Sequence, residues 1–330
     1  MMETLEGAEL CFPQLLNSSC TKLQHPKSVS TLIYITLSVI CVLTVTLNLL
    51  VIISISHYKQ LQTPTNLLLL SLAVSDFSIG LLMMFQIALV EGCWYFGDQV
   101  CAFYFVLDYT FTSASIGTMV LISIDRYVAI CHPLHYSSVL THRKVDFSVS
   151  FCWTFSLLFH CVRFRNNLKY LGKFKSCVGE CVVIIDQVSG FVDLIMSFLG
   201  PISVIVLLYL RVFAVAVSQA RAMRTHLKSI TLQCSVTVTA MRSEMKAART
   251  LGVVVVVFLV CVCPYFCVAL SGQGAALSTS SAAFIICLFY FNSCLNPLIY
   301  ALFYPWFRKT IRLIFTLQIL KPDSCEANIL

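Results

Sequence analysis

The chain alternates between long apolar runs and short polar segments. Crossing the hydrocarbon core of a bilayer takes about 20 residues of helix, and seven of the runs are close to that length or longer. Backbone N–H and C=O groups find no partners in lipid, so each run is predicted to be a helix. The sequence therefore predicts an all-α membrane protein, a seven-transmembrane helix bundle. Its predicted spans are residues 31–56, 66–90, 101–130, 145–161, 188–217, 250–270 and 280–303.

A second helical pattern follows the seventh span. Apolar and basic side chains alternate there at helical spacing, which predicts a short amphipathic helix lying on the inner leaflet. The apolar positions are Phe307, Ile311, Ile314 and Phe315, and the basic positions are Arg308, Lys309 and Arg312. We expect an N-terminal tail over residues 1–30, a single seven-helix membrane domain over 31–303, and this helix with a C-terminal tail over 304–330.

Composition and charge agree with a membrane protein. Hydrophobic residues make up 58% of the chain and charged residues 11%, and the mean hydropathy is +0.87. Most Lys and Arg residues fall on one side of the predicted bundle, which makes that side cytoplasmic and the N-terminus extracellular, although residues 163–175 form a basic cluster outside. The net charge of +7 then follows from topology, so the partner it implies is membrane lipid and not nucleic acid.

The segments assigned to the exterior contain a glycosylation signal and six cysteines. Asn17 opens the triplet Asn-Ser-Ser, an acceptor for an N-linked glycan. Disulfides form in an oxidising exterior, whereas cysteines inside the spans are expected to be packing residues. Six cysteines allow 15 pairings, which their spacing does not resolve. They are Cys11, Cys20, Cys93, Cys101, Cys177 and Cys181.

Four acids lie inside predicted spans, where an ionised side chain costs about 2.5 to 3.5 kcal/mol. They are Asp76, Asp108, Asp125 and Asp193. Asp125 precedes Arg126 at the inner end of the third span and is expected to pair with it. Asp108 lies five helical turns from Arg126 on the same face, which links an outer carboxylate to an inner guanidinium.

Asp76 has small polar neighbours at the same depth. A carboxylate among hydroxyl and amide oxygens can hold a hard cation such as Na⁺, while the alternative is a polar network that only ties helices together. The candidate sodium ligands are Asp76, Ser115, Asn292, Ser293 and Asn296. Apart from this allosteric Na⁺, no cofactor is expected.

Several motifs, in this order, resemble the rhodopsin-like G-protein-coupled receptors across almost the whole chain. They are "NLLLLSLAVSD" (66–76), "SIDRYVAICHPLHY" (123–136), Pro201 with Tyr209, Pro264, and "NPLIY" (296–300). Four further stretches resemble the trace amine-associated receptors: "AVSQARAMR" (216–224), "SEMKAARTLGVVV" (243–255), "SCVGECVV" (176–183) and "YFNSCLNPLIY" (290–300).

The resemblance implies a plasma-membrane receptor that binds an amine and activates a heterotrimeric G protein. The stimulatory, cyclic-AMP-raising G protein and an olfactory role are implied with it. Asp108 matches the amine-binding acid of the family. Coupling and switching are implied for Asp125, Arg126, Tyr127, Tyr209, Glu244, Asn296, Pro297 and Tyr300, with Glu244 a second partner for Arg126. Val262 stands in "CVCP" (261–264) where many relatives have Trp, a departure that bears on activation.

The same resemblance suggests a disulfide map. Cys101 would pair with Cys181 and tie the third span to the second outer loop. The first choice for the other four is Cys11 with Cys177 and Cys20 with Cys93, and the swapped pairing stays open.

Asp193 decides which amine is expected. It lies in the first turns of the fifth span, which borders the same outer cavity as Asp108, and two carboxylates in one cavity favour a ligand with two positive charges. The sequence therefore predicts a receptor for diamines such as cadaverine or putrescine. The alternative is a monoamine receptor in which Asp193 pairs with Arg163, Arg165 or Lys175. Aromatic and polar residues expected around the amines are Tyr109, Thr112, Tyr265, Phe266 and Tyr290.

Two other classes of protein fit less well. A cation transporter using Asp76, Asp108 and Asp193 as a relay would show inverted repeats or broken helices, and the sequence shows no self-similarity. An enzyme is not expected, because no segment brings together a nucleophile, a base and an orienting group.

Overall fold

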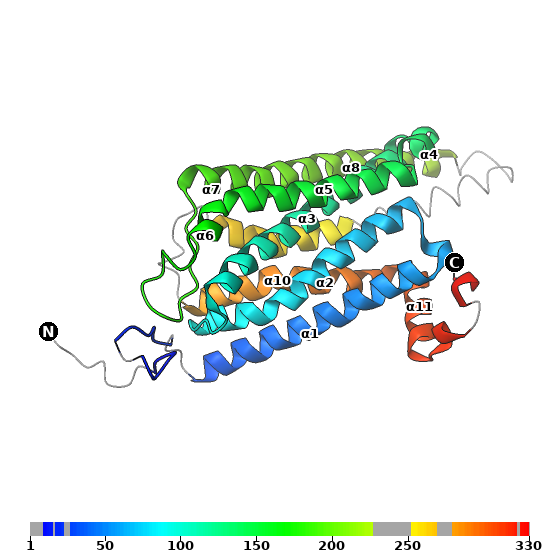
Figure 1. Cartoon of the computed structure of the whole chain (residues 1–330). Helices are drawn as coiled ribbons and strands as arrows, with labels where there is room; N and C mark the ends of the chain where they lie inside the picture. The colour runs from blue at the N-terminus through cyan, green and yellow to red at the C-terminus, as the bar shows by residue number, and fades with distance from the viewer. Residues whose placement is uncertain are drawn as a thin grey trace.

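The computed structural model describes residues 9–15, 17–22, 27–226, 252–268, 279–321 and 324–329. These residues form a bundle of long helices lying side by side, with the N-terminal segment at one end (Figure 1). The long helices are α1 (Lys27–His57), α2 (Pro64–Glu91), α3 (Gly97–Cys131), α5 (His142–Arg163), α8 (Gly200–His226), an apolar helix at Gly252–Val268, and α10 (Thr279–Phe303). Shorter helices are α4 (Tyr136–Val139), α6 (Arg165–Lys169), α7 (Gln187–Leu194) and α11 (Pro305–Phe315).

The apolar helices match the predicted spans. Six of them are long and apolar enough to cross a membrane, counting α7 and α8 as one span over Gln187–Val215. The seventh, Gly252–Val268, is shorter within the described part of the chain. Most of the others extend a few residues past the predicted limits, because polar residues at the membrane surface continue the helix. The all-α prediction is confirmed.

The outer face of the bundle is apolar. Along α5, Phe147, Phe151, Phe155 and Phe159 repeat every four residues and stack, with ring centroids 6.0 to 6.5 Å apart. Phe147 is 72% exposed and Phe151 is 62% exposed. Side chains this apolar and this exposed are expected where lipid is the solvent.

Local sequence explains where α2 begins and ends. The Thr63 side chain accepts a hydrogen bond from the Asn66 N–H at 3.3 Å, and Pro64 occupies the first turn, where its missing N–H is not needed. Gly92 ends the helix with φ of +79°, a left-handed conformation that glycine adopts without strain. Thr63, Pro64 and Gly92 thus fix the ends of α2, which contributes residues to the site described below.

Helices α3 and α5 approach closely at one glycine. A Cβ atom on Gly117 would meet the Sγ atom of Cys152, and that Sγ lies 3.9 Å from the carbonyl oxygen of Ala114. The missing side chain lets the two backbones come together, so Gly117 fixes how deeply α3 sits against α5.

The fifth span is not a regular α-helix. Ile195–Leu199 form a π turn between α7 and α8, in which the Gly200 N–H donates to the carbonyl oxygen of Ile195 five residues earlier. Pro201 has no backbone N–H, so it cannot donate a hydrogen bond to the preceding turn. The regular helical hydrogen-bond pattern is therefore interrupted at this point. The π turn adds a residue between Asp193 and the rest of the span, and the sequence reading anticipated only a kink at Pro201.

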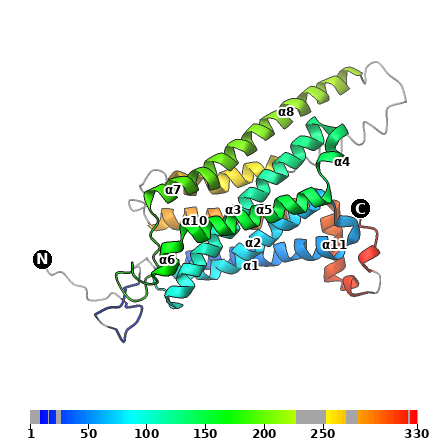
Figure 2. The same cartoon turned by 45° about the horizontal axis from the view of Figure 1, so that its top comes forward.

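Helix α11 turns across the end of the bundle opposite the N-terminus (Figure 2). Trp306 and Phe307 are buried in the core of the bundle, while Phe315 is 74% exposed. The amphipathic helix is confirmed, and its Phe307 packs against the other helices of the bundle. Its position on the inner leaflet stays a prediction.

Candidate functional site

A cavity of about 270 Å³ opens between α2, α3, the fifth span, the helix Gly252–Val268 and α10. Its volume is slightly below the roughly 300 to 1,000 Å³ typical of small-molecule sites, which suits a small ligand. All seven residues predicted to bind the amine line it: Asp108, Asp193, Tyr109, Thr112, Tyr265, Phe266 and Tyr290. Stacking of Phe198 on Phe266, with centroids 4.1 Å apart, joins the fifth span to the helix Gly252–Val268 beside the cavity.

Asp108 projects from α3 and is held by neutral groups. The Tyr290 hydroxyl on α10 lies 3.3 Å from its Oδ1 atom and 3.4 Å from Oε1 of Gln86 on α2. The Tyr104 hydroxyl donates to the same Gln86 oxygen at 2.7 Å, which fixes the amide. Among the described residues Asp108 has no cationic partner, so its negative charge is open to a ligand.

Asp193 lies on α7 and is 6% exposed. The Ser197 hydroxyl, in the π turn, donates to its Oδ1 atom at 2.9 Å. Nη1 of Arg163, at the end of α5, lies 3.2 Å from Oδ2, and both side chains are buried. Of the three basic residues considered for Asp193, Arg163 is therefore the partner, whereas Lys175 pairs with Asp98 at 2.8 Å.

The environment of Arg163 is aromatic. Its guanidinium carbon lies 4.5 Å from the ring centroid of Tyr109 and 5.1 Å from that of Phe164, both within the range of cation–π attraction. Tyr109 and Asp193 line the cavity, whereas Arg163, which contacts both, is not among its lining residues. The cavity thus has two carboxylates on its wall, one of which already has a cation.

His160 extends this polar layer. One ring nitrogen, Nε2, lies 2.8 Å from the Ser113 hydroxyl, which is 3.4 Å from the hydroxyl of Ser197. Ser113, Ser197 and Gln86 line the cavity but were not predicted from the sequence. Of these three residues, Gln86 could have been predicted from the sequence, because it is a polar residue between apolar neighbours in a predicted span.

Three disulfides close the outer end. Cys101 pairs with Cys181, which confirms that prediction. The first choice for the other four was wrong, because Cys11 pairs with Cys93 and Cys20 with Cys177. The reason is a parallel bridge between Ser19 and Val178, with the Cys20 N–H donating to the carbonyl oxygen of Val178 at 2.9 Å, which places Cys20 beside Cys177.

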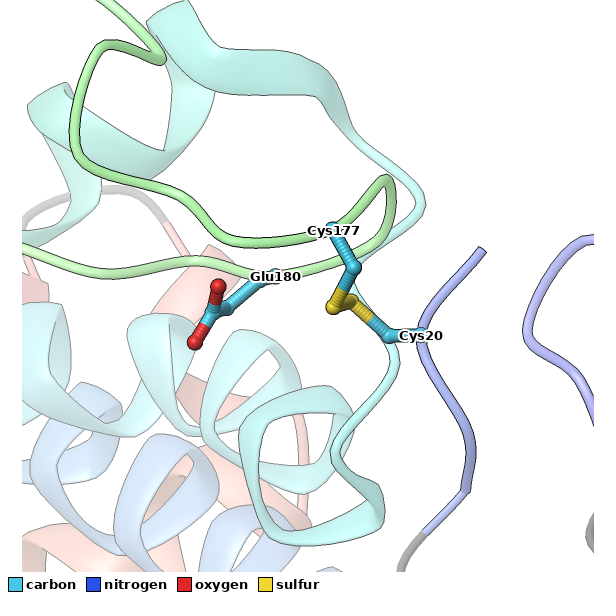
Figure 3. Close-up of side chains that lie close together, drawn as sticks. All are labelled: Cys20, Cys177 and Glu180. Carbon is cyan, nitrogen blue, oxygen red and sulfur yellow. A yellow bond between two sulfur atoms is a disulfide. The ribbon is translucent and has the colours of Figure 1, made fainter. Parts of the chain in front are cut away.

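Glu180 lies next to the Cys20–Cys177 disulfide (Figure 3). Its carboxylate and the two sulfur atoms lie within 4.8 Å of one another, but both sulfurs are used in the disulfide and are not thiolate ligands for a metal. Hydrogen bonds from the Ser176 backbone N–H and hydroxyl lower the pKa of Glu180. Glu180 also lines a separate cavity of about 320 Å³ at the outer end.

At the inner end, Arg126 is paired and 6% exposed. Its Nε donates to Asp125 Oδ2 at 2.8 Å, and its Nη2 donates to the Thr65 hydroxyl at 3.0 Å. The Tyr136 hydroxyl donates to the other oxygen of Asp125 at 3.0 Å. The expected Asp125–Arg126 ion pair is present.

The other predicted switch residues are placed in different ways. The Tyr127 hydroxyl lies 3.4 Å from Nε2 of His132, Tyr209 is packed against the core, and Pro297 lies inside α10. Glu244 lies outside the described residues, and Tyr300 is described only as part of α10.

Asp76, on α2, is fully buried. The Ser115 hydroxyl donates to its Oδ1 at 3.2 Å, and Asn296 Nδ2 donates to its Oδ2 at 2.7 Å. The amide oxygens of Asn292 and Asn296 are buried without a hydrogen-bond partner. A cavity of about 20 Å³, lined by Ser115, Asn292, Ser293 and Val262 among others, lies beside these groups. Unpaired oxygens around a carboxylate suit a small hard cation.

Comparison with known proteins identifies the family to which this chain belongs. The model of the family "7 transmembrane receptor (rhodopsin family)" matches residues 47–300. The chain belongs to that family. Trace amine-associated receptor 13c of Danio rerio is 39% identical to it, with 98% of this chain and 97% of the relative covered. Human trace amine-associated receptor 6 is 37% identical over 98% and 96%, and mouse trace amine-associated receptor 4 is 34% identical over 97% and 95%.

The chain is therefore a multi-pass membrane receptor of the trace amine-associated group. Its relatives are receptors and not enzymes, as expected from the sequence. Membership in the family implies a small-molecule ligand and a heterotrimeric G protein as partners. Within this receptor, the described contacts distinguish the two wall carboxylates: Asp193 has a cationic partner and Asp108 has none among the described residues.

Proposed function

We propose that the receptor binds a biogenic amine through a single ammonium group held by Asp108. The observation that supports this is the contrast between the two carboxylates: among the described residues Asp108 is bonded by a neutral hydroxyl and has no cationic partner, whereas Asp193 faces Arg163 at 3.2 Å. An ammonium beside Asp108 would neutralise the remaining negative charge of the cavity. Tyr290, Tyr109 and Tyr265 present aromatic surfaces for the same cation.

The far wall then binds the rest of the ligand. Asp193, Ser113 and Ser197 line it with hydrogen-bonding oxygens, and Phe266 and Phe289 line it with apolar surface. An amine with a short apolar chain and a neutral donor at its other end fits these groups. Charge balance favours this ligand, since Asp108, Asp193 and Arg163 together carry one net negative charge.

A diamine receptor is the second candidate. What favours it is that both carboxylates line one cavity, so a second ammonium could approach Asp193 from the side opposite Arg163. A carboxylate has about four lone-pair positions, which leaves room for another donor. Against it, the second ammonium and Arg163 would share one carboxylate in a buried site.

The response is proposed to pass to a stimulatory G protein at the inner end, as the family resemblance suggests. Support comes from the buried Arg126, whose pairing with Asp125 would have to change when the inner face opens. We also propose a plasma-membrane location with the N-terminus outside, where the exposed Asn17 would be glycosylated and the three disulfides would form. An olfactory role rests on the resemblance alone.

An allosteric Na⁺ is proposed at Asp76, with Ser115, Asn292, Ser293 and Asn296 as further ligands. The buried, unpaired amide oxygens of Asn292 and Asn296 support it. Bound there, Na⁺ would join α2, α3 and α10.

A cyclic-AMP assay in transfected cells tests the amine proposal. Straight-chain monoamines and diamines of matched length would be applied to the wild type, to Asp108→Ala and to Asp193→Ala. Asp108→Ala is expected to abolish all amine responses, because a ligand ammonium left unpaired costs on the order of 2 to 5 kcal/mol. Retained responses in cells that express Asp108→Ala at the surface would refute the anchor. Selectivity of the wild type for diamines would favour the second candidate.

A further inference from the structure

We propose that Arg163 is a specificity-determining residue that acts through Asp193 and limits the cavity to ligands with one positive charge. The proposal rests on the proposed amine function and specifies its ligand class. It makes a prediction that family motifs do not contain: removing one arginine from the end of α5 should turn a monoamine site into a diamine site.

The position of Arg163 supports this role. Its side chain is 5% exposed, and that of Asp193 is 9% exposed, so water screens their attraction weakly. Tyr109 and Phe164 hold the guanidinium plane by their rings. Asp193 lines the cavity but Arg163 does not, so Arg163 pairs with this carboxylate without being one of the groups that face a ligand.

Arg163 is not easily displaced by a ligand. A guanidinium keeps its proton in proteins, so Arg163 cannot relieve repulsion from a ligand ammonium by becoming neutral. Removing one partner of a buried ion pair leaves the other charge uncompensated, which is strongly unfavourable. The described residues already give Nε and Nη1 of Arg163 no hydrogen-bond acceptor of good geometry, so Asp193 is the group that balances this cation.

Asp193 is consequently a poor second anchor while Arg163 is present. A second ammonium in front of Asp193 would gain one carboxylate but would meet a guanidinium on the other side of it. Without Arg163 the same carboxylate would be buried and without a cation, and its remaining hydrogen bond within the described part of the chain would be the one from Ser197. It would then attract the second ammonium of a diamine, as Asp108 attracts the first.

The experiment compares five chains in the cyclic-AMP assay: wild type, Arg163→Gln, Asp193→Asn, the double variant Arg163→Gln/Asp193→Asn, and Arg165→Gln. Arg165 is the matched control, because it is an exposed arginine two residues away. The probes are pentylamine and 1,5-diaminopentane, which differ by one ammonium at equal chain length. Surface labelling of an N-terminal tag normalises the responses.

Arg163→Gln is expected to shift the potency ratio toward the diamine by about tenfold or more, a change of about 1.4 kcal/mol in relative binding. Arg165→Gln should leave the ratio unchanged. Asp193→Asn should weaken both amines, since Arg163 then repels them, and the double variant should recover the pentylamine response with no preference for the diamine.

Two results would overturn the proposal. One is an unchanged ratio in Arg163→Gln at normal surface expression. The other applies if Arg163→Gln does not reach the surface: equal pentylamine potency in Asp193→Asn and the double variant would show that the Arg163 charge has no effect. Absence of any amine response in the wild type is a different failure, because it refutes the proposed amine function itself.

Discussion

The Tyr290 hydroxyl lies 3.3 Å from Oδ1 of Asp108, joining α10 to α3 at the carboxylate that faces the cavity. This contact orients Asp108 without neutralising it, since a phenol hydroxyl supplies a donor and no positive charge. Gln86 is within 3.4 Å of the same hydroxyl, so the tyrosine is held between two acceptors. The geometry keeps the carboxylate turned toward the cavity before a ligand arrives.

Tyr290→Phe is therefore expected to lower amine potency about tenfold while leaving the maximal response intact. A hydrogen bond to a charged group contributes about 1.5 to 3 kcal/mol, and the long contact places this one at the lower end. Dose–response curves for one monoamine measure the effect. Tyr104→Phe is the matched control, because its hydroxyl donates to Gln86 and not to Asp108. Equal losses in the two variants would contradict a direct role for Tyr290.

The contact between α3 and α5 predicts a stability effect. Gly117→Ala places a methyl group against the Sγ of Cys152, and overpacking of this kind costs about 1 to 3 kcal/mol. Lower surface expression and a lower melting temperature in detergent are expected. Adding Cys152→Ala should restore both, because it removes the clashing sulfur.

Gly190→Ala provides a comparison for this pair. A Cβ there would lie 3.8 Å from the nearest atom outside its chain neighbours, an ordinary contact, so little change is expected. If the double variant at Gly117 and Cys152 were as unstable as Gly117→Ala alone, the close approach would not be the cause.

Much of the fold was predictable from the sequence because the membrane imposes one strong rule. In lipid, an apolar run of about 20 residues can satisfy its backbone hydrogen bonds only as a helix. Each of the seven predicted ranges contains a helix in the structure. The placement of α11 was less predictable. Its amphipathic pattern is clear, but the pattern does not say whether Phe307 faces lipid or the other helices.

The cavity was predictable residue by residue, but its charge balance was not. Asp108, Asp193 and Tyr290 project from the wall where helical spacing predicts them. The pairing of Asp193 depends on the end of α5, which lies about 30 residues earlier in the chain. Sequence reasoning left Arg163, Arg165 and Lys175 as equal candidates, and only the fold separates them. The π turn at Ile195–Leu199 was equally hidden, since no residue pattern in the span requires it.

The revised disulfide pairing predicts a non-additive effect of cysteine substitution. If Cys20 bonds Cys177, then Cys20→Ser, Cys177→Ser and the double variant should all lose the same stability, about 2 to 4 kcal/mol. Combining Cys11→Ser with Cys177→Ser should cost more than either, because it breaks two bonds. Surface expression of each variant measures this. If instead Cys11→Ser and Cys177→Ser together cost no more than either alone, while Cys20→Ser and Cys177→Ser add, the pairing first expected from the sequence would be correct.

Asp76→Asn tests the proposed cation site by a measurement that does not depend on which amine is native. Na⁺ bound among α2, α3 and α10 would stabilise the arrangement described here, in which Arg126 is paired with Asp125 at the inner end. Replacing Na⁺ with choline at constant ionic strength should then raise amine potency in the wild type. A coupling of about 1 kcal/mol corresponds to roughly a fivefold change.

Asp76→Asn should remove this dependence on Na⁺, because the amide keeps the shape of the side chain but loses the charge that holds the ion. Ser78→Ala is a suitable control, since its hydroxyl bonds only the Val74 carbonyl on the same helix among the described contacts. A wild type that responds identically in Na⁺ and choline would leave Asp76 in the alternative role considered from the sequence. There, its bonds to Ser115 and Asn296 serve only to hold three helices together.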